Sequence, residues 1–465
     1  MAKKYNDPIW AYLAQGMALL SGLLLLPLIA WKLSAGELVL WLAFIAFQSL
    51  ILLIDFGFQP TVSRNVAYVF SGQSQLLATG ISKERNNNQI SIALFSALFY
   101  ATKLLYSRLL LISALFVILI ATPYLIFIIN RHELDLGLIF AWLFFALGAM
   151  GNLYFNYGIG IMNGSGRVAK ANRSVFLGRL SFLVCASSAL LMDYGLVAVG
   201  VSLILGTIIS RTVLFFEVLR IPEIKSLATA TRDRDNEIKM RSVLWHNAWR
   251  QGLVQLMGFI LQRGNILIAA AYLSASDAAS YNLTVTVLVT LIALSTLYAN
   301  IRIPRMASLQ AADRRHEIKR IYLLAFLIAM LFFTLGFVAF VTTVPWILDA
   351  VSADVTLDLP GEMFALLFII FILEVNHVVA SIYITSKNKI PFVRSSIISA
   401  CAALILSMFS VHFYGLWGLI ISQGIVQLAY NNWRWPQIAI LDLWGRPDVA
   451  APAEERSKLL EERQA

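Results

Sequence analysis

Long apolar stretches alternate with short polar ones along nearly the whole chain, and most of the apolar stretches are long enough to span a membrane. A helix needs roughly 20 apolar residues to cross the hydrocarbon core of a bilayer. Twelve stretches meet that requirement, so the pattern predicts an all-α polytopic membrane protein with twelve transmembrane helices. The predicted spans cover residues 10–32, 38–60, 104–129, 137–162, 174–192, 195–217, 250–272, 279–301, 321–346, 362–385, 392–412 and 415–434.

The two halves of the chain resemble each other. Residues 11–41 match residues 251–281 at a constant offset of 240 positions, and a shorter echo follows later in each half. Six spans per half is an even number, so both halves begin on the same side of the membrane. We therefore predict a duplicated transporter with two parallel six-helix lobes and a central cleft between them. Matched pairs include Gln15 and Gln255, Ser34 and Ser274, Glu37 and Asp277, and Gly195 and Gly415.

Composition and charge placement support a membrane location and give the chain an orientation. The chain is 59% hydrophobic and 13% charged, with a mean hydropathy of +0.76. With the amino terminus inside, all but three of the 36 basic residues fall in or beside cytoplasmic segments. Lys32 and Arg131 fall outside, and Arg263 falls within the membrane. Because positive charge is retained on the cytoplasmic side, we expect both termini to be cytoplasmic.

The polar segments suggest four regions. We expect an N-terminal lobe over 1–220, a cytoplasmic connector over 221–245, a C-terminal lobe over 246–436 and a cytoplasmic tail over 437–465. Residues 62–103 fit interfacial helices, since apolar residues at helical spacing flank a polar centre. The charged sequence of residues 454–464 predicts a short soluble helix. External loops are short and leave no room for a catalytic domain, so we expect the function to be carried out within the helix bundle.

Several function classes lack their signatures in this sequence. The net charge of +10 is spread over the internal loops rather than clustered with aromatics, which does not favour nucleic acid as a partner. Cys185 and Cys401 lie in separate apolar segments with no pairing or metal spacing. No phosphate-binding glycine loop and no Cys/His metal motif occurs, so we expect no cofactor, no metal and no direct ATP drive.

Arg263 is the principal candidate for substrate binding. It lies about thirteen residues into the seventh predicted span, roughly 20 Å deep at 1.5 Å per residue. An arginine at that depth costs about 2.5 to 3.5 kcal/mol on insertion scales, so it should face a wet cavity or a partner. The equivalent position in the first half is Leu23, so the scaffold does not require arginine there. Gln262 and Asn265 flank it as further candidates, and the alternative is a structural pair with Glu374 or Asp55.

Three more arginines lie at the internal ends of spans in nearly equivalent places of the two halves. Arg64 follows the second span, and Arg302 and Arg305 follow the eighth. The planar fork of guanidinium offers paired donors to phosphate oxygens, so these residues suit a diphosphate at the cytoplasmic mouth. The alternative is that they only fix topology.

Titratable residues within the spans are candidates for ion coupling. Glu374 and His377 lie one turn apart in the tenth span, and Asp55 ends the second. Burial of a carboxylate or imidazole in the membrane moves its titration, which suits coupling to H⁺ or possible Na⁺ gradients. The alternatives are hydrogen bonding between helices for the first pair, and pairing with Arg64 or Arg263 for Asp55.

The internal half of the fourth span is polar and aromatic. Asn152, Tyr154, Asn156, Tyr157 and Asn163 fall there. Such residues often join helices through hydrogen bonds. Contact with sugar is the alternative.

The ends of three spans resemble bacterial polysaccharide flippases of the multidrug, oligosaccharidyl-lipid and polysaccharide exporter superfamily. The relevant segments are Leu53-Ile54-Asp55-Phe56-Gly57-Phe58 with Ser63-Arg64-Asn65, then Ile303-Pro304-Arg305-Met306, then Lys387-Asn388-Lys389-Ile390-Pro391-Phe392. The resemblance implies a V-shaped bundle of two lobes that flips undecaprenyl-diphosphate-linked oligosaccharide, such as O-antigen units, to the periplasmic leaflet. It also implies a cationic central cavity from the first, second, seventh and eighth spans, and polysaccharide polymerase machinery as a partner.

Two other readings compete with a flippase. Multidrug antiporters of the same superfamily usually need acidic cavity residues, whereas the first span from Trp10 to Lys32 contains none. Similar peptidoglycan-precursor flippases typically carry two additional spans. A membrane-embedded glycosyltransferase or ligase would use Glu37 or Asp135 beside an external acceptor, but the short external loops leave little room for one. We therefore expect a transporter rather than an enzyme.

Overall fold

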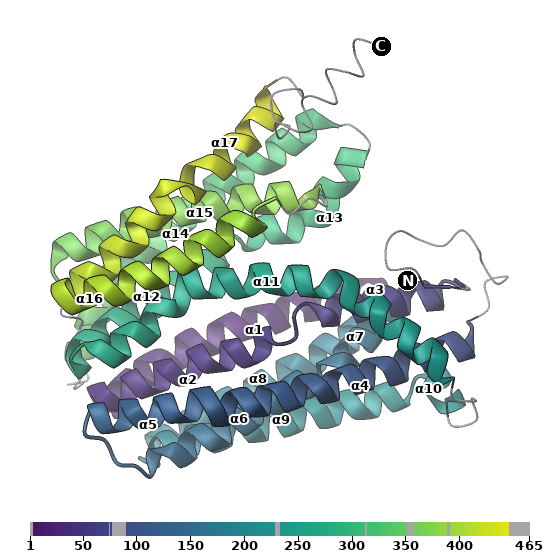
Figure 1. The fold of residues 1–465 in the computed structure, drawn as a ribbon, viewed down its shortest axis with the longest axis horizontal. Coiled ribbons are helices and arrows are strands. Elements are labelled where there is room, and N and C mark those ends of the chain that lie inside the picture. Colours follow the sequence, from purple (N-terminus) through teal and green to yellow (C-terminus); the bar gives the residue numbers. More distant parts are fainter. Residues whose placement is uncertain are drawn as a thin grey trace. The chain divides into compact units, whose positions relative to one another are not determined.

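The computed structural model describes residues 3–73, 75–76, 90–227, 233–311, 314–350, 357, 359–387 and 391–445. Every regular element within these ranges is a helix, including one π-helical turn, η1 (Val117–Ala121). Nine helical segments of the described part are long and apolar enough to cross a membrane. The chain is an all-α, multi-pass membrane protein, as the hydropathy pattern predicts (Figure 1).

All twelve predicted spans coincide with helix. Some spans consist of two helices joined at a break, and one long helix holds the last two spans on either side of Gly415. The elements of the first half are α1 (Lys3–Lys32), α2 (Ala35–Leu53), α3 (Phe58–Phe70), α4 (Ile92–Phe116), η1, α5 (Thr122–Arg131), α6 (Leu138–Tyr154), α7 (Asn156–Gly164), α8 (Val168–Leu191), α9 (Gly195–Leu219) and α10 (Pro222–Ser226). Those of the second half are α11 (Arg234–Tyr272), α12 (Ala275–Ser295), α13 (Leu297–Ala311), α14 (Arg315–Ala350), α15 (Gly361–Ser386), α16 (Val393–Ala429) and α17 (Asn431–Trp444).

The chain divides into two compact units. The first contains Met1–Phe259, Ser274–Ala279 and Ala350–Val355, and the second contains Ile260–Leu273, Ser280–Asp349 and Thr356–Ala465. The helix α11 contributes to both, because it runs without interruption from the predicted connector into the seventh span.

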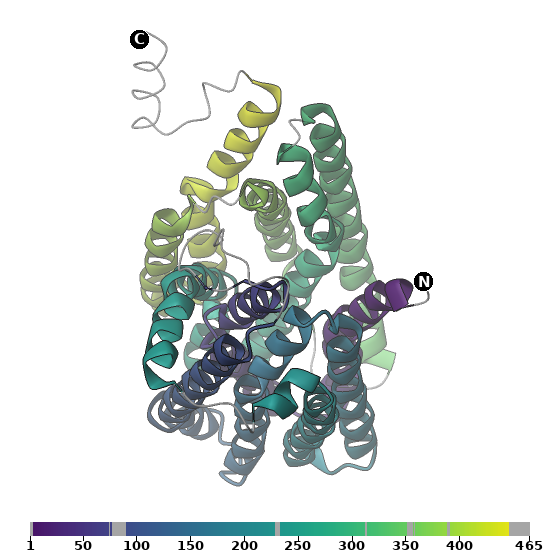
Figure 2. The same ribbon diagram turned by 90° about the vertical axis from the view of Figure 1, so that its right-hand side faces the viewer.

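In the first unit, α8 packs against α1 and α9, α6 packs against α9, and α3 packs against α7 (Figures 1 and 2). Aromatic side chains fill the region between α2 and α6, where Trp41 meets Phe145 at 5.2 Å and Phe44 meets Trp142 at 5.4 Å between ring centroids. Burying such rings supplies much of the packing energy, because each covers a large apolar area. In the second unit, α15 packs against α13, α16 and α17.

The sequence repeat corresponds to repeated local structure. Ser34 caps α2, where its hydroxyl accepts the Glu37 N–H at 3.3 Å and its own N–H donates to the Glu37 carboxylate at 3.0 Å. At the matching turn before α12, the Ser274 hydroxyl accepts the Asp277 N–H at 3.2 Å. Each arrangement satisfies a backbone donor that the start of a helix leaves free.

The second echo of the repeat is structural as well. Gly195 and Gly415 both adopt left-handed backbone conformations, with φ of 67° and 53°. Glycine reaches this region at no steric cost, so it permits the sharp reversal between consecutive spans at both places.

Three expectations about segment ends need correction or lie beyond the described residues. The predicted second span, 38–60, is not one helix, because α2 ends at Leu53 and α3 begins at Phe58. Between them, Phe56 and Gly57 have φ of 46° and 72°, which an α-helix cannot contain. In the predicted interfacial segment 62–103, the described helical parts belong to α3 and α4, and residues 77–89 lie outside the described ranges. The predicted tail helix at 454–464 also lies outside them.

Candidate functional site

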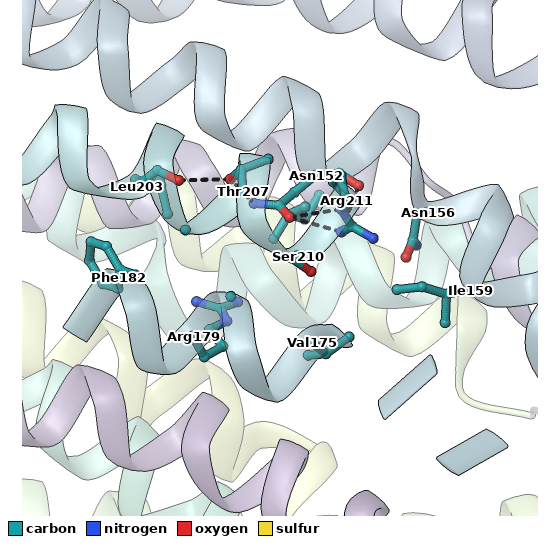
Figure 3. A pocket seen from close by; sticks show the side chains of 13 residues that line it. Asn152, Asn156, Ile159, Val175, Arg179, Phe182, Leu203, Thr207, Ser210 and Arg211 are labelled. Atoms are coloured by element: carbon teal, nitrogen blue, oxygen red, sulfur yellow. Dashed lines mark hydrogen bonds between the residues drawn. The ribbon is translucent and has the colours of Figure 1, made fainter. Parts of the chain in front are cut away.

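A polar cavity of about 270 Å³ lies inside the first unit, among α2, α6, α7, α8 and α9 (Figure 3). Its lining combines two arginines and two asparagines with small and apolar side chains, and no carboxylate of the described residues lines it. The polar lining residues are Asn152, Asn156, Arg179, Thr207, Ser210 and Arg211.

Small residues at the crossing of α8 and α9 bring the two arginines to the same cavity. A Cβ atom added at Gly178 would lie 2.5 Å from Ser210 Cβ, and one added at Gly206 would lie 2.6 Å from the Gly178 carbonyl oxygen. Real Cβ atoms do not approach so closely, so glycine is what allows this helix pair to pack backbone against backbone. Arg179 directly follows Gly178, and Arg211 directly follows Ser210, so each guanidinium starts beside the closest approach.

Arg211 is held by Asn152 of α6. Its Nε and Nη2 donate to Asn152 Oδ1 at 3.2 and 2.8 Å, and Nη2 also donates to the Asn152 carbonyl oxygen at 3.1 Å. That carbonyl belongs to the last turn of α6, where backbone acceptors lack partners in a following turn. Asn152 Nδ2 in turn donates to Thr207 Oγ1 at 2.8 Å. The predicted role of Asn152 in joining helices is therefore confirmed, and it also fixes a cation.

The two guanidinium groups are not neutralised by described side chains. The Nη1 atom of Arg211 is buried and has no hydrogen-bond partner among the described residues. Arg179 forms no ion pair or hydrogen bond with any residue in the described ranges. The carboxylate of Glu217, also on α9, is already bonded to Lys170 at 2.6 Å and Arg220 at 2.8 Å. The cavity consequently carries two positive charges and spare donors.

A second polar cluster surrounds Asp55 at the break between α2 and α3. Tyr106 of α4 donates its hydroxyl to Asp55 Oδ1 at 2.5 Å, and the Gln59 N–H donates to Oδ2 at 3.2 Å. The side chain of Asn156, which also lines the cavity, lies within interaction range of this carboxyl. Asp55 is buried, at 9% exposed, and its partners in the structure are a phenol and amides rather than an arginine.

The arginines predicted for the cytoplasmic mouth lie in different surroundings. Arg64 is exposed on α3. In the second unit, Arg302 stacks over the Tyr298 ring at 5.1 Å, and Arg305 lies 4.0 Å from Glu317. Their predicted role in substrate binding stays a prediction.

The candidates around Arg263 lie in the second-unit part of α11. Asn265 is buried and donates Nδ2 to the Leu419 carbonyl oxygen at 3.3 Å and to Gln423 Oε1 at 3.4 Å, so it joins α11 to α16. Gln262 and Arg263 are half-buried. No carboxylate in the described ranges forms an ion pair with Arg263, and this includes Glu374.

Glu374 and His377 contact each other within α15. His377 Nδ1 lies 3.3 Å from Glu374 Oε2, and Glu374 is 7% exposed. The predicted role of this pair in ion coupling stays a prediction.

Sequence reasoning missed Arg179 and Arg211. Both were counted among the basic residues in or beside cytoplasmic segments, but α8 runs from Val168 to Leu191 and α9 from Gly195 to Leu219, which places both arginines well inside membrane helices. A usable signal was present, because both fall within the predicted spans 174–192 and 195–217. No sequence pattern singles out Tyr106, since its partner Asp55 is distant in the sequence.

The fold is shared with solved membrane transporters. The multidrug transporter DinF-BH, of the MATE type and solved with a bound ligand, aligns with a TM-score of 0.59 and 15% identity, covering 95% of each chain. The lipid II flippase MurJ, in an inward closed conformation, aligns with a TM-score of 0.59 and 11% identity, covering 94% of this chain and 91% of the other. A Pyrococcus furiosus transporter of the MOP superfamily, described as having a binding pocket of reverse polarity, aligns at 0.54 with 14% identity over 93% and 95% of the two chains.

These likenesses define the class of architecture. The chain shares its fold with MATE-type transporters of the MOP superfamily and with the flippase MurJ. No protein-family model matches the chain, and no curated protein sequence matches it at a significant level. The structures named here are described as transporters and a flippase.

Proposed function

We propose that this protein flips undecaprenyl-diphosphate-linked oligosaccharide from the cytoplasmic to the periplasmic leaflet of a bacterial inner membrane by alternating access. The fold supports a transporter, and the charge of the membrane-embedded residues supports an anionic substrate. The sugar composition is left open by this proposal, and O-antigen units are one member of the substrate class.

The observation that carries the proposal is the set of arginines without acidic partners. Arg179, Arg211 and Arg263 lie within the membrane helices α8, α9 and α11, and none of them pairs with a carboxylate in the described part of the chain. An unpaired guanidinium in a membrane helix is costly, which makes a binding role its most direct explanation. Guanidinium binds phosphate oxygens through paired donors, which suits a diphosphate head group.

In this mechanism the arginines bind the charged head group while the lipid tail stays in the bilayer. Arg263 is the proposed contact in the second unit, with Gln262 and Asn265 beside it, and Arg64, Arg302 and Arg305 are proposed to attract the head group from the cytoplasm. Movement of the two predicted lobes would then expose the sugar to the periplasm. A proton or sodium gradient is proposed to reset the cycle through Asp55 or the Glu374 and His377 pair.

The test is leaflet-resolved accumulation of lipid-linked oligosaccharide in cells depleted of the protein, measured with a membrane-impermeant sugar-labelling reagent. We expect accumulation on the cytoplasmic face, reversed by wild type but not by Arg263→Ala, because the alanine variant loses a head-group contact. As a control, the expression level of the variant in the membrane and its melting temperature in detergent must match those of wild type.

Other outcomes separate the alternatives. Normal arrival at the outer face with failed sugar transfer would point to a glycosyltransferase or ligase. Unchanged lipid-linked pools would favour a small-molecule exporter. Full complementation by Arg263→Ala would remove Arg263 from the site while leaving a flippase possible through the remaining arginines.

A further inference from the structure

We propose that the cavity between α8 and α9 is a binding site for a diphosphate group, built entirely within the first unit. Neither Arg263 nor any of the arginines predicted at the cytoplasmic mouth is among its lining residues. That the diphosphate belongs to a lipid rests on the proposed function, whereas binding of the group itself does not.

The charge of the cavity is the first argument. Among the described residues, two arginines and no carboxylate line it, which gives a charge of +2 in a space bounded by apolar groups such as Phe182 and Leu203. Low polarity around a charge strengthens its attraction for an opposite charge. A diphosphate diester carries two negative charges, so the ligand and the lining would compensate each other.

Unused hydrogen-bond donors are the second argument. Arg211 uses Nε and Nη2 to bind Asn152 and leaves Nη1 buried without a described partner. Arg179 contributes its whole guanidinium without a partner in the described ranges. Buried donors are nearly always satisfied in folded proteins, so the buried Nη1 of Arg211, left free beside the cavity, indicates an acceptor that binds there, and the half-buried Arg179 adds a second charge.

The volume limits what the acceptor can be. At about 270 Å³ the cavity greatly exceeds the roughly 10–15 Å³ that one water requires. It lies just below the lower end of the roughly 300–1,000 Å³ range typical of small-ligand pockets. The space is therefore large enough for a diphosphate head group.

The arrangement is held in place before any ligand arrives. The glycines at the α8 and α9 crossing fix the origin of both side chains, and Asn152 fixes the direction of Arg211. A site whose donors are already oriented loses little conformational freedom on binding. Figure 3 shows Arg179 extending from α8 and Arg211 from α9 within the same cavity.

A purely structural role makes a different prediction about Arg179. Arg211 joins α9 to α6 through Asn152, so its loss would weaken packing whatever the cavity binds. Arg179 makes no such contact with the described residues, so its replacement removes no hydrogen bond or ion pair in that part of the chain. Arg179→Gln should thus melt at about the wild-type temperature and still bind the ligand more weakly.

The experiment measures binding of inorganic pyrophosphate to the purified full-length protein in detergent by calorimetry and by ligand-induced melting shift. We expect saturable binding to wild type, at least about tenfold weaker binding to Arg179→Gln and to Arg211→Gln, and unchanged binding to Arg173→Gln, since each cavity arginine supplies a charge-assisted contact. Arg173 is the matched control, because it lies on α8 but is exposed and does not line the cavity.

Competition identifies the source of the group. Displacement of pyrophosphate by undecaprenyl diphosphate, but not by undecaprenol, would assign the site to the lipid head group, and displacement by free phosphates alone would assign it to a soluble anion. Absence of pyrophosphate binding, or equal affinity of wild type and Arg179→Gln, would overturn the inference. The proposed function is tested independently by the leaflet assay, which follows oligosaccharide transfer in cells. A failure of one proposal can therefore be told from a failure of the other.

Discussion

At the scale of single residues, the neutrality of Asn152 is what keeps the cavity positive. The amide satisfies two nitrogens of Arg211 without adding negative charge. A carboxylate at the same place would turn hydrogen bonds that the guanidinium already makes charge-assisted into a buried ion pair. The native amide therefore holds Arg211 and leaves its positive charge available to an anion.

Asn152→Asp should separate stability from binding. We expect the stability of the variant to stay within about 1 kcal/mol of wild type, because the attraction of the new carboxylate for Arg211 is offset by its desolvation and by loss of the hydrogen bond from Asn152 to Thr207. Pyrophosphate affinity should fall at least about tenfold, since the new carboxylate cancels one positive charge. Melting in detergent and calorimetry on the same sample measure both effects.

Asn152→Leu provides the control for this prediction. It removes the anchor and leaves Arg211 nitrogens unpaired, so it should lower both stability, by about 1–3 kcal/mol, and affinity. If Asn152→Asp bound pyrophosphate as well as wild type, the charge of the cavity would not govern the site.

At the scale of elements, the crossing of α8 and α9 depends on glycine. The Cβ that alanine would add at Gly178 meets Ser210 Cβ at 2.5 Å and the Gly206 carbonyl oxygen at 2.7 Å. Backbone atoms cannot yield by rotation, so the helices must separate. Separation would also move apart the origins of Arg179 and Arg211.

Gly178→Ala should accordingly destabilise the protein by about 1–3 kcal/mol, the usual cost of overpacking. Gly22→Ala in α1 is the matched control, because a Cβ there meets nothing within 4 Å and the change should stabilise the helix by up to about 1 kcal/mol. Thermal unfolding of both variants in detergent checks the pair. Wild-type stability of Gly178→Ala would show that the crossing can relax.

The elements themselves were largely predictable from the sequence, and the cavity was not. Apolar length marks a membrane helix whatever its neighbours are, and the Ser34 and Ser274 turns repeat because each starts a helix. Arg179 and Arg211 were misplaced because hydropathy locates span ends only within several residues, and arginine near an end is normally a topology signal. That Asn152 meets Arg211 depends on how α6 packs against α9, which one sequence does not specify.

At the scale of the whole molecule, the fold alone does not decide between exporting drugs and flipping anionic lipids. The multidrug transporter DinF-BH and the lipid II flippase MurJ align equally well, at a TM-score of 0.59 each. Function is therefore decided by the residues placed on the shared fold. In the proposed function those residues are the arginines of α8, α9 and α11, whereas the acids Asp55 and Glu374 contact Tyr106 and His377.

This charge distribution predicts discrimination against cations. The purified protein should show no saturable binding of the cationic dye ethidium in fluorescence polarisation, because a dye cation entering the cavity would be repelled by two guanidinium groups without described acidic partners. DinF-BH in the same detergent serves as the reference protein, since it is a multidrug transporter of the same fold. Saturable dye binding to this protein, unaffected by pyrophosphate, would mean that a cation site lies elsewhere in the chain. A multidrug exporter would then explain the transport better than a flippase does, although it would leave the arginines of α8 and α9 without a ligand.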